Sequence, residues 1–402
     1  MKHIASDILI IGAGIIGLSI ARELQGRHPD LNITIIEKEP DIAAHASGRN
    51  SGVIHAGFYY TPDSLKARFT VEGNKLLTDY CLQHNLKINR CGKVVVAKNE
   101  KEVEMLYELK KRGDKNGVDL ELIDENDLKS IEPNANTCQK ALYSPATSTI
   151  NPREVAGHIA NSLNGRVDIL LNERFIKREG SFAIKTNKHK IEFKYLINAA
   201  GLYADKVAHQ FDVGYKYTLL PFKGMYIQYR DNDLIQKHIY PVPNLNNPFL
   251  GVHFTKTVDG RVKAGPTAIP ALWRENYDGV SNFNVNELIE ILFYEARLFL
   301  SNAFDFRNLA FEEIKKYYGQ HLIKEASRLV KNIDLNKFGS YMETGIRAQL
   351  LDKEKMRLVM DFVVEHGENS THILNAVSPA FTCAFSFSKF IVDEIEKYSS
   401  FN

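Results

Sequence analysis

Residues 6–25 read SDILIIGAGIIGLSIARELQ, and residues 33–39 read ITIIEKE. The first stretch contains a G-x-G-x-x-G motif formed by Gly12, Gly14 and Gly17. The motif follows a strand-like apolar run and opens a helix-like one, which is typical of dinucleotide binding. The glycines permit a tight turn, close approach of a pyrophosphate, and packing of the helix on the strand. Glu37 ends the next strand-like run and can accept hydrogen bonds from an adenosine ribose.

Composition narrows the class of protein. The chain has 402 residues, which predicts two or three domains, and hydrophobic and charged contents of 44% and 25% are ordinary for a globular protein. A formal net charge of +2 gives no basic field, so nucleic acid is not an expected partner. The four cysteines form no CxxC pair and no metal-like cluster with histidine. We therefore expect free thiols in a reducing compartment and no bound metal.

No segment approaches ~18 consecutive apolar residues, so no transmembrane helix is expected. The apolar N-terminal run reads as a strand followed by an amphipathic helix, without a cleavage site for a signal peptide. These patterns favour a cytoplasmic location. They leave open a peripheral contact with the inner membrane.

Further along the chain, alternating and helical patterns predict the remaining elements. Helices are expected near 65–84, 101–117, 152–163 and 379–398 and within 284–333. Strands are expected at 93–97, in four runs over 167–201, within 216–274, and at 346–351, 359–364 and 371–376. The first βαβ unit, the strand ending at Gly201 and the C-terminal region are expected to form one discontinuous domain. The intervening segments would form a second, antiparallel domain.

Three further segments suggest that the dinucleotide carries a flavin. The stretch 43–64 is too apolar and aromatic for a linker, and YLINAAGLYAD (195–205) ends a strand in two alanines and a glycine. ETGIRAQ (343–349) combines with NAVSPAFTCAF (375–385), where a proline-led turn begins a helix whose N–H groups can face an isoalloxazine. A nicotinamide enzyme usually needs only the first βαβ unit and its neighbours.

The chain resembles the D-amino-acid oxidase-type FAD superfamily and, within it, the L-2-hydroxyglutarate dehydrogenase/oxidase family. The resemblance rests on SGVIHAGFYYTPDSLKARF (51–69), CGKVVVA (91–97), YSPATSTINPREV (143–155), YLINAAGLYAD (195–205), PFKGMY (221–226), YPVPN (240–244), FLGVHFT (249–255), AGPTAI (264–269), GIRAQ (345–349) and NAVSPAFT (375–382). It implies an α/β (α+β) protein with a discontinuous Rossmann-like FAD-binding domain and an antiparallel-sheet substrate domain. We place the former at residues 1–90, 150–215 and 340–402, and the latter at 91–149 and 216–339.

The resemblance also implies non-covalent FAD, since Cys383 is better explained as a small buried thiol than as a flavin attachment site. Motif and resemblance together predict FAD contacts at Gly12, Gly14, Ile15, Ile16, Gly17, Glu37, Lys38, Ser47, Arg49, Asn50, Ser51, Gly52, Ile176, Ala199, Ala200, Gly201, Arg347, Pro379, Ala380, Phe381 and Thr382.

The implied chemistry is oxidation of a secondary alcohol beside a carboxylate, with hydride passing from C2 to flavin N5. Arg347 is the best candidate to bind the C1 carboxylate through a bidentate fork. The alcohol needs a base with a pKa near the working pH, such as a histidine near ~6.5. His253, in the strand-like GVHFT, is slightly preferred to His55, in VIHAG. Lys223 and Tyr240 are candidates for binding the distal carboxylate of a 2-hydroxy dicarboxylate or for shaping the pocket.

Two alternatives remain. A sibling enzyme could oxidise an amino acid or an N-methyl amine, and a flavoprotein without turnover could serve as a scaffold subunit. The leading hypothesis is oxidation of L-2-hydroxyglutarate, or a close 2-hydroxy acid, to the 2-oxo acid (2-oxoglutarate). The electrons would pass to oxygen or a membrane quinone, and the sequence does not decide between these acceptors.

Overall fold

The computed structural model describes residues 2–245 and 249–398, and these divide into two compact units. Unit 1 consists of residues 1–50, 152–220 and 348–402, and unit 2 of residues 51–151 and 221–347. The last four residues of the predicted C-terminal segment, 399–402, lie outside the description. The chain passes between the units within the strands β13 (Tyr217–Gly224) and β20 (Gly345–Asp352) and after Asn50 and Asn151.

Unit 1 is built on an eight-stranded sheet in which the central strands are parallel. Its order is β10-β11-β12-β1-β2-β9, and β23 joins β12 and carries β22. The strands are β1 (Lys2–Ile11), β2 (Ile33–Ile36), β9 (Val167–Leu170), β10 (Phe175–Arg178), β11 (Ala183–Thr186), β12 (His189–Asn198), β22 (Val363–Gly367) and β23 (Ser370–Asn375), and β21 (Arg357–Leu358) pairs with β20. Residues 8–11 of β1 are all buried, as a parallel strand covered on both faces requires.

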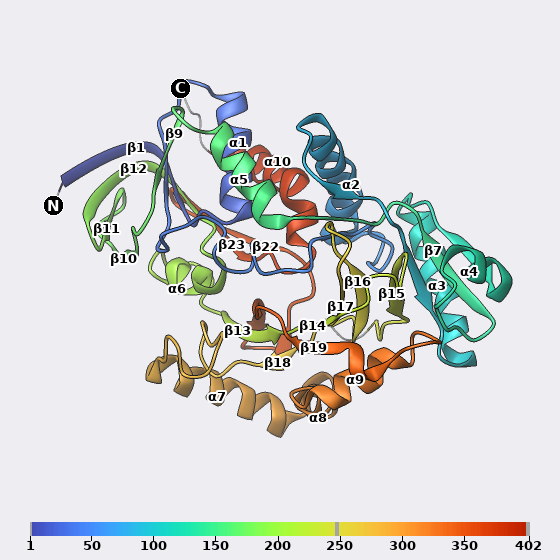
Figure 1. Ribbon diagram of the computed structural model, residues 1–402. Helices are drawn as coiled ribbons and strands as arrows, with labels where there is room; N and C mark the ends of the chain where they lie inside the picture. Colours follow the sequence, from blue (N-terminus) through green and yellow to red (C-terminus); the bar gives the residue numbers. More distant parts are fainter. Residues whose placement is uncertain (1, 246–248, 399–402) are drawn as a thin grey trace. The chain divides into compact units, whose positions relative to one another are not determined.

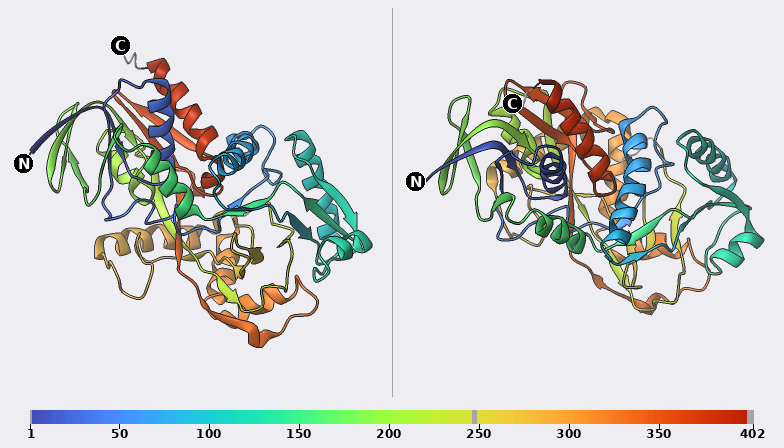
Figure 2. Two further views of the ribbon diagram at one scale, coloured as in Figure 1. Left: turned by 45° about the horizontal axis from the view of Figure 1, so that its top comes forward. Right: turned by 90° about the horizontal axis from the view of Figure 1, so that it is seen from above.

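Four helices accompany this sheet: α1 (Ile15–Arg27), α5 (Pro152–Ser162), α6 (Ala204–His209) and α10 (Ala380–Tyr398). Helix α1 packs against α10 and α5, so the first and last helices of the chain lie side by side (Figures 1 and 2). Its buried residues, which include Ile15, Leu18 and Leu24, lie on most sides of the helix, as expected for a helix enclosed by other elements. The first and last helices of the chain therefore belong to one compact unit.

Unit 2 contains a large mixed sheet of order β19-β14-β17-β16-β15-β5-β7-β6 and the small sheet β3-β8-β4. The strands are β3 (Val53–Ile54), β4 (Ile88–Asn89), β5 (Lys93–Val96), β6 (Glu121–Asp124), β7 (Lys140–Ser144), β8 (Ser148–Ile150), β14 (Ile227–Tyr229), β15 (His238–Pro241), β16 (His253–Lys256), β17 (Val262–Gly265), β18 (Ile269–Pro270) and β19 (Phe338–Tyr341). The antiparallel expectation holds for most pairs, but β15 and β5 pair in parallel.

The two faces of this large sheet differ in chemistry. One face carries Val94, Ile239, Phe254 and Ala264, which join one continuous apolar core with residues of α9. Because side chains alternate along a strand, the neighbouring residues point to the opposite face. There the paired register places a row of polar groups across five strands: Ser144, Lys93, His238, Thr255 and Lys263.

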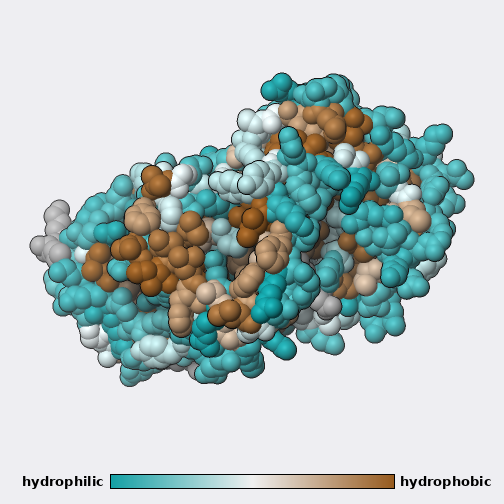
Figure 3. All heavy atoms as spheres, turned by 90° about the horizontal axis from the view of Figure 1, so that it is seen from below, coloured by the Kyte–Doolittle hydropathy of each residue, from teal (hydrophilic) through white to brown (hydrophobic). Residues whose placement is uncertain are grey.

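The helices of unit 2 are α2 (Leu65–Gln83), α3 (Glu100–Lys115), α4 (Glu125–Ile131), α7 (Val285–Ser301), α8 (Phe306–Lys315) and α9 (Gly319–Ser327). Helix α7 buries Ile291 and Leu298 but exposes a second apolar stripe at helical spacing: Val285, Ile289, Leu292, Phe293, Phe299 and Leu300. Phe311, Ile314, Tyr317 and Tyr318 continue these exposed groups on and just after α8. Figure 3 looks onto this face, where apolar side chains gather.

Residues 51–90 belong to unit 2, whereas the sequence assigns them to the FAD-binding domain. Strand pairing explains the difference, because β3 and β4 both pair with β8. Phe58 and Tyr59 also pack with Val95 in one apolar cluster of unit 2. The stretch 43–64 therefore consists of two segments: the residues up to Asn50 belong to unit 1, and the following residues belong to unit 2.

Candidate functional site

The glycine-rich turn of unit 1 has the geometry of a dinucleotide site. Gly12 has φ +109°, and a Cβ there would stand 2.5 Å from the carbonyl oxygen of Ala199. A Cβ on Gly17 would stand 2.0 Å from the Gly12 oxygen, and one on Gly14 would stand 3.0 Å from Ser47 Oγ. Only glycine fits the first two positions. The turn also leads into α1, whose N-cap Gly14 provides no side-chain cap.

Glu37 is fixed beside this turn at the end of β2. The Ala13 N–H donates to Glu37 Oε2 at 2.9 Å, and the Glu39 N–H donates to Oε1 at 3.1 Å. A carboxylate has about four lone-pair positions, so capacity remains for ribose hydroxyls. Glu37 is buried directly after β2, and its contact with the ribose stays a prediction.

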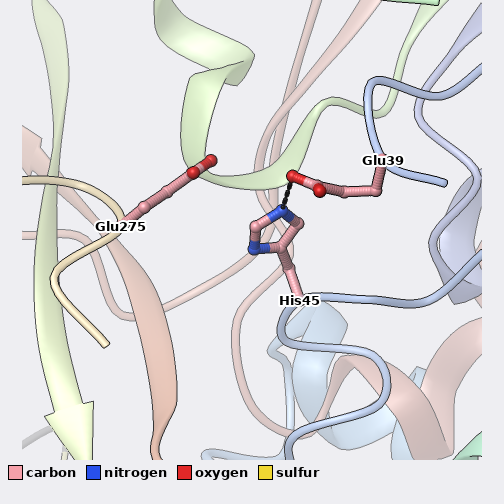
Figure 4. A group of neighbouring side chains, drawn as sticks. All are labelled: Glu39, His45 and Glu275. Atoms are coloured by element: carbon pink, nitrogen blue, oxygen red, sulfur yellow. Dashed lines mark hydrogen bonds and ion pairs between the residues drawn. The ribbon is translucent and has the colours of Figure 1, made fainter. Parts of the chain in front are cut away.

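Lys38, by contrast, is engaged within unit 1. Its Nζ lies 2.9 Å from His45 Nε2 and forms an ion pair with Glu39, and His45 Nε2 lies 2.8 Å from Glu39 Oε1. Figure 4 shows the His45 and Glu39 side chains meeting. Burial opposes the charge on Glu39, but hydrogen bonds from Lys38 and His45 lower its carboxyl pKa overall. The structure thus gives Lys38 a bridging role between β2 and the following loop.

The loop after β2 folds back on the glycine-rich turn. Ser47 Oγ accepts the Ile15 N–H at 2.9 Å, which brings this predicted residue to the start of α1. Arg49 and Asn50 are half-buried and brace the loop. The Arg49 Nε donates to the Ala44 oxygen at 2.9 Å, and the Asn50 amide donates to the Ser47 oxygen at 2.8 Å. The predicted neighbours Ser51 and Gly52 belong to unit 2.

Two further predicted segments also lie where unit 1 presents strand and helix ends. The Ala199 N–H donates to the Ile11 oxygen at 2.9 Å, so Ala199, Ala200 and Gly201 follow directly from the end of β1 and β12. Pro379 precedes α10, and Ala380, Phe381 and Thr382 form its first turn, where helix N–H groups lack i−4 partners. Ile16 is buried in the first turn of α1.

Ile176 is placed differently. It lies on β10 with an exposed side chain, whereas the Glu173 N–H donates to the Glu37 oxygen at 2.7 Å. The predicted contact of Ile176 with FAD stays a prediction.

A second cluster of predicted residues lies on the polar face of the large sheet in unit 2. His253 on β16 and Tyr240 on β15 occupy adjacent strands, and their rings stack with centroids 3.7 Å apart at 17°. Tyr226 meets the His253 ring edge-on at 6.3 Å. These aromatic neighbours fix the orientation of the imidazole and keep water from it.

The hydrogen bonding of His253 fixes its tautomer. Nδ1 lies 2.9 Å from the carbonyl oxygen of Gly251, and a carbonyl can only accept, so Nδ1 carries the hydrogen. Nε2 then presents a lone pair, and it is buried with no hydrogen-bond partner among the described residues. Burial lowers the pKa of His253 well below its ordinary value, and the charges of His55, Arg347 and Lys93 lower it further. The expected titration near ~6.5 is thus moved to lower pH.

His55 follows β3 in the same unit and is also buried. Burial lowers its pKa to about 3, with further lowering by the charges of Lys93, His238 and Arg347. The Asn74 amide donates to the His55 carbonyl oxygen at 3.0 Å and holds the backbone there. The two candidate bases are therefore close enough to the same cations to be influenced by both.

Arg347 lies on β20, where its guanidinium stands 5.6 Å from the ring centroid of Phe249. No carboxylate within residues 2–245 and 249–398 forms an ion pair with it. Its charge lowers the pKa values of His253 and His55. Burial raises the pKa of Tyr226 to about 12, and the charge of Arg347 opposes that rise. An arginine in these surroundings can take a carboxylate with both N–H pairs.

Lys223 is half-buried on β13, and burial lowers its pKa. The part of the chain that the structure describes gives its ammonium no hydrogen bond or ion pair. It lies beside Ile269 of β18, and its strand β13 also pairs with β20, the strand of Arg347. Lys223 and Arg347 therefore share one sheet, whereas Tyr240 and His253 lie together in the large sheet.

Three buried residues on the polar face were missed by the sequence reasoning. Burial lowers the pKa of Lys93 to about 7, that of Lys263 to about 8 and that of His238 to about 3. Lys263 donates to the Ser51 oxygen at 3.1 Å, and His238 Nδ1 accepts the Lys256 N–H. Lys93 is the first residue of the apolar run KVVV. Because side chains alternate along a strand, the sequence could have indicated that Lys93 lies on the face opposite the core.

The family model described as "FAD dependent oxidoreductase" matches residues 7–394. The L-2-hydroxyglutarate dehydrogenase of Indibacter alkaliphilus is 36% identical over 94% of this chain and 96% of its own length. The human protein named mitochondrial L-2-hydroxyglutarate dehydrogenase is 34% identical over 97% of this chain and 89% of its own. The protein of the same name from Nematostella vectensis is 35% identical over 96% of this chain and 90% of its own length.

Among solved structures, the FAD-bound L-alpha-glycerophosphate oxidase of Mycoplasma pneumoniae superposes with a TM-score of 0.76 at 23% identity. The match covers 98% of this chain and 95% of that one. Glycine oxidase from Geobacillus kaustophilus gives 0.72 at 15% identity over 99% and 96%. At these identities the likeness shows the fold, which agrees with the predicted D-amino-acid oxidase-like class. No helix within the described residues is long and apolar enough to cross a membrane.

Proposed function

Because the chain belongs to the FAD-dependent oxidoreductase family that includes the L-2-hydroxyglutarate dehydrogenases, we propose that it oxidises L-2-hydroxyglutarate to 2-oxoglutarate. Close 2-hydroxy acids are secondary candidates. The reaction removes a hydride from C2 and a proton from the C2 hydroxyl. Bound FAD supplies the hydride acceptor, flavin N5. The residues of the chain must bind the acid, orient C2 and take the proton.

The observation that carries the proposal is the state of His253. Its Nδ1–H donates to the Gly251 oxygen, so the buried Nε2 is an acceptor without a partner in the described part of the chain. A neutral imidazole held in one tautomer can accept the hydroxyl proton without first losing one of its own. The stacked Tyr240 ring keeps Nε2 in a fixed direction. His253 is accordingly assigned as the base that deprotonates the alcohol.

Arg347 is assigned to the C1 carboxylate. Its guanidinium has no acidic partner among residues 2–245 and 249–398, and its charge acts on His253. A bidentate pair with the carboxylate fixes a plane and so orients the adjacent C2. His55 is kept neutral by burial and by the same cations, so it is the second candidate for the base.

The FAD contacts are assigned to unit 1 by the glycine-rich turn, Glu37, Ser47 and the first turn of α10. We propose that this FAD is held without a covalent bond. Acid precipitation should release the yellow cofactor into the supernatant, because non-covalent contacts are lost on unfolding. Colour retained in the protein pellet would contradict this assignment, with Cys383 as the first residue to examine.

The substrate assignment is tested by anaerobic reduction of the flavin. L-2-hydroxyglutarate should bleach the flavin absorbance rapidly, while glutamate, glycine and sarcosine should not. Rapid bleaching by an amine instead would favour the sibling amine oxidase. Absence of bleaching by every hydroxy and amino acid would favour the scaffold alternative. The buried acceptor Nε2 favours the alcohol because an alcohol proton must be removed during the reaction.

We further propose that the electrons leave to a membrane quinone and that the exposed apolar face of α7 and α8 contacts the lipid surface. Leu300 is 74% exposed and Ile289 is 63% exposed. Exposing this many neighbouring apolar side chains to water is unfavourable. Phe299 and Phe311 pack edge to face and join the two helices into one patch (Figure 3). An amphipathic helix with aromatic residues at its end is typical of interfacial binding.

Flotation with lipid vesicles tests this contact. The parent protein should float with the vesicles, and the double variant Ile289→Glu/Leu300→Glu should remain in the dense fraction with unchanged flavin reduction. Phe182→Glu, at an exposed apolar position of unit 1, is the matched control. A parent that stays with the dense fraction and forms a dimer that the double variant loses would make this face a contact between copies. If the reduced enzyme passes electrons to oxygen as fast as to a quinone, oxygen would be assigned as the electron acceptor instead of the quinone.

A further inference from the structure

Lys93 is a fully buried lysine at the start of β5. Its Nζ lies 4.5 Å from the ring centroids of Phe58 and Tyr59 and 4.8 Å from that of Tyr240. No hydrogen-bond acceptor and no carboxylate meets this ammonium within the described residues. The aromatic faces are its contacts, and none of them carries a full negative charge.

Such a position is unfavourable for a cation unless something completes it. A buried charge without a counter-ion is strongly penalised, and desolvated cation–π contacts offset only part of that penalty. Burial accordingly lowers the pKa of Lys93 to about 7. Lys263 on the same face illustrates the contrast, because its ammonium donates to the Ser51 oxygen at 3.1 Å. An anion placed beside Lys93 would supply the missing acceptor and charge.

The surroundings of Lys93 connect it to the assigned base. Tyr240 lies on β15, between β5 and β16, and its ring contacts both the Lys93 ammonium and the His253 imidazole. The charges of Lys93 and Arg347 both lower the pKa of His253 and of His55. Two cations without acidic partners among the described residues therefore flank the same pair of histidines.

We propose that the Lys93 ammonium binds the distal C5 carboxylate of the substrate and selects dicarboxylic 2-hydroxy acids. The inference rests on the proposed function, in which Arg347 takes the C1 carboxylate and His253 the hydroxyl proton. Once those two groups are assigned, the second carboxylate is the anion that remains. Tyr240 then shapes the site by separating the base from this cation, and Lys223 keeps a position that water can reach.

The test compares two substrates that differ in one charge: L-2-hydroxyglutarate and its C5 amide. Flavin reduction is measured anaerobically for the parent holoenzyme and for Lys93→Met, which keeps an unbranched chain of similar length. We expect Lys93→Met to lower kcat/KM for the dicarboxylate by about 10- to 150-fold, the range of a charge-assisted hydrogen bond. The value for the C5 amide should change by less than threefold.

Controls separate this role from others. Lys263→Met and Lys223→Met should leave the ratio between the two substrates unchanged, and a collapse of the ratio in Lys223→Met would transfer the role to Lys223. Equal losses for both substrates in Lys93→Met would assign Lys93 to the fold or to the base and overturn the proposal. If Lys93→Met retains no FAD, Lys93→Gln is measured in its place. A parent that does not oxidise L-2-hydroxyglutarate would refute the proposed function, which is a separate result.

Discussion

The two faces of the large sheet in unit 2 are made by the same strands and serve different ends. Val94 and Phe254 point into an apolar core. Their sequence neighbours, Lys93 and His253, point to the opposite face, where they keep a charge and a lone pair away from water. One residue along the strand thus changes the environment from hydrocarbon packing to the candidate site. The apolar face positions the polar one.

This difference teaches that burial alone does not identify the role of a residue here. Phe254, His253 and Lys93 are all almost fully buried. Phe254 gains from burial, whereas His253 and Lys93 have pKa values lowered by it. Changes on the apolar face should therefore affect folding, and changes on the polar face should affect chemistry. The predictions below test that separation.

The largest effect is expected at His253. His253→Gln removes the base, so the rate constant of flavin reduction should fall ~100- to 10,000-fold. The FAD content and the melting temperature should stay close to those of the parent. Stopped-flow reduction under anaerobic conditions measures the rate. A parent-like rate in this variant, combined with a large loss in His55→Gln, would assign the base to His55; parent-like rates in both would exclude a histidine base.

Phe254→Ala tests the other face of the same strand. Removing a fully buried phenylalanine from the core should lower the free energy of unfolding by about 3–5 kcal/mol. Urea unfolding followed by circular dichroism measures the loss. The flavin reduction rate of the folded fraction should remain within a few fold of the parent, because the ring faces away from His253. A selective loss of rate without loss of stability would break the separation between the faces.

Arg347→Lys should have the next largest effect. Lysine keeps the charge but loses the bidentate fork, so C2 is oriented less well. We expect a loss of about 2–4 kcal/mol in transition-state stabilisation, measured as kcat/KM for L-2-hydroxyglutarate. FAD binding, followed by the absorbance spectrum, serves as the control. An unchanged kcat/KM with FAD still bound would remove Arg347 from the site.

Much of unit 1 could be predicted from the sequence because its signals are local. The strand, glycine turn and helix of residues 6–25 require particular backbone conformations at Gly12 and Gly17, and the structure shows the close contacts responsible. Glu37 and Ser47 lie beside that turn, and their contacts with FAD stay predictions. The match to the FAD-dependent oxidoreductase family includes this stretch and the segments around it.

The polar face of unit 2 could be predicted only in part. His253, His55 and Arg347 stood out because their segments resemble a known family, but Lys93 did not, since its surroundings are made by three separate segments. Its parallel pairing with His238 joins strands some 145 residues apart in the chain, which no local pattern reveals. Residues 51–90 pack within unit 2 for the same reason, through the pairing of β3 and β4 with β8, and their predicted place in the FAD-binding domain stays a prediction.

The smallest effect is expected in the pH profile of kcat/KM, which reports the free enzyme. A histidine base must be neutral, and the burial of His253, with His55, Lys93 and Arg347 nearby, lowers its pKa well below the ordinary value. The imidazole then stays neutral throughout the physiological range. With the C5 amide of L-2-hydroxyglutarate as substrate, kcat/KM should change less than about twofold between pH 6 and 8.

With L-2-hydroxyglutarate itself, the same profile should fall as the pH rises above about 7, where the free enzyme loses the Lys93 ammonium. The sign follows from binding, because only the protonated lysine attracts the distal carboxylate. Lys93→Met should abolish this decline and leave the two substrates with parallel profiles. An acid limb near pH 6.5 with both substrates would show that His253 titrates like an exposed histidine. That result would mean that the polar face is open to water and that its contrast with the apolar face is smaller than the structure indicates.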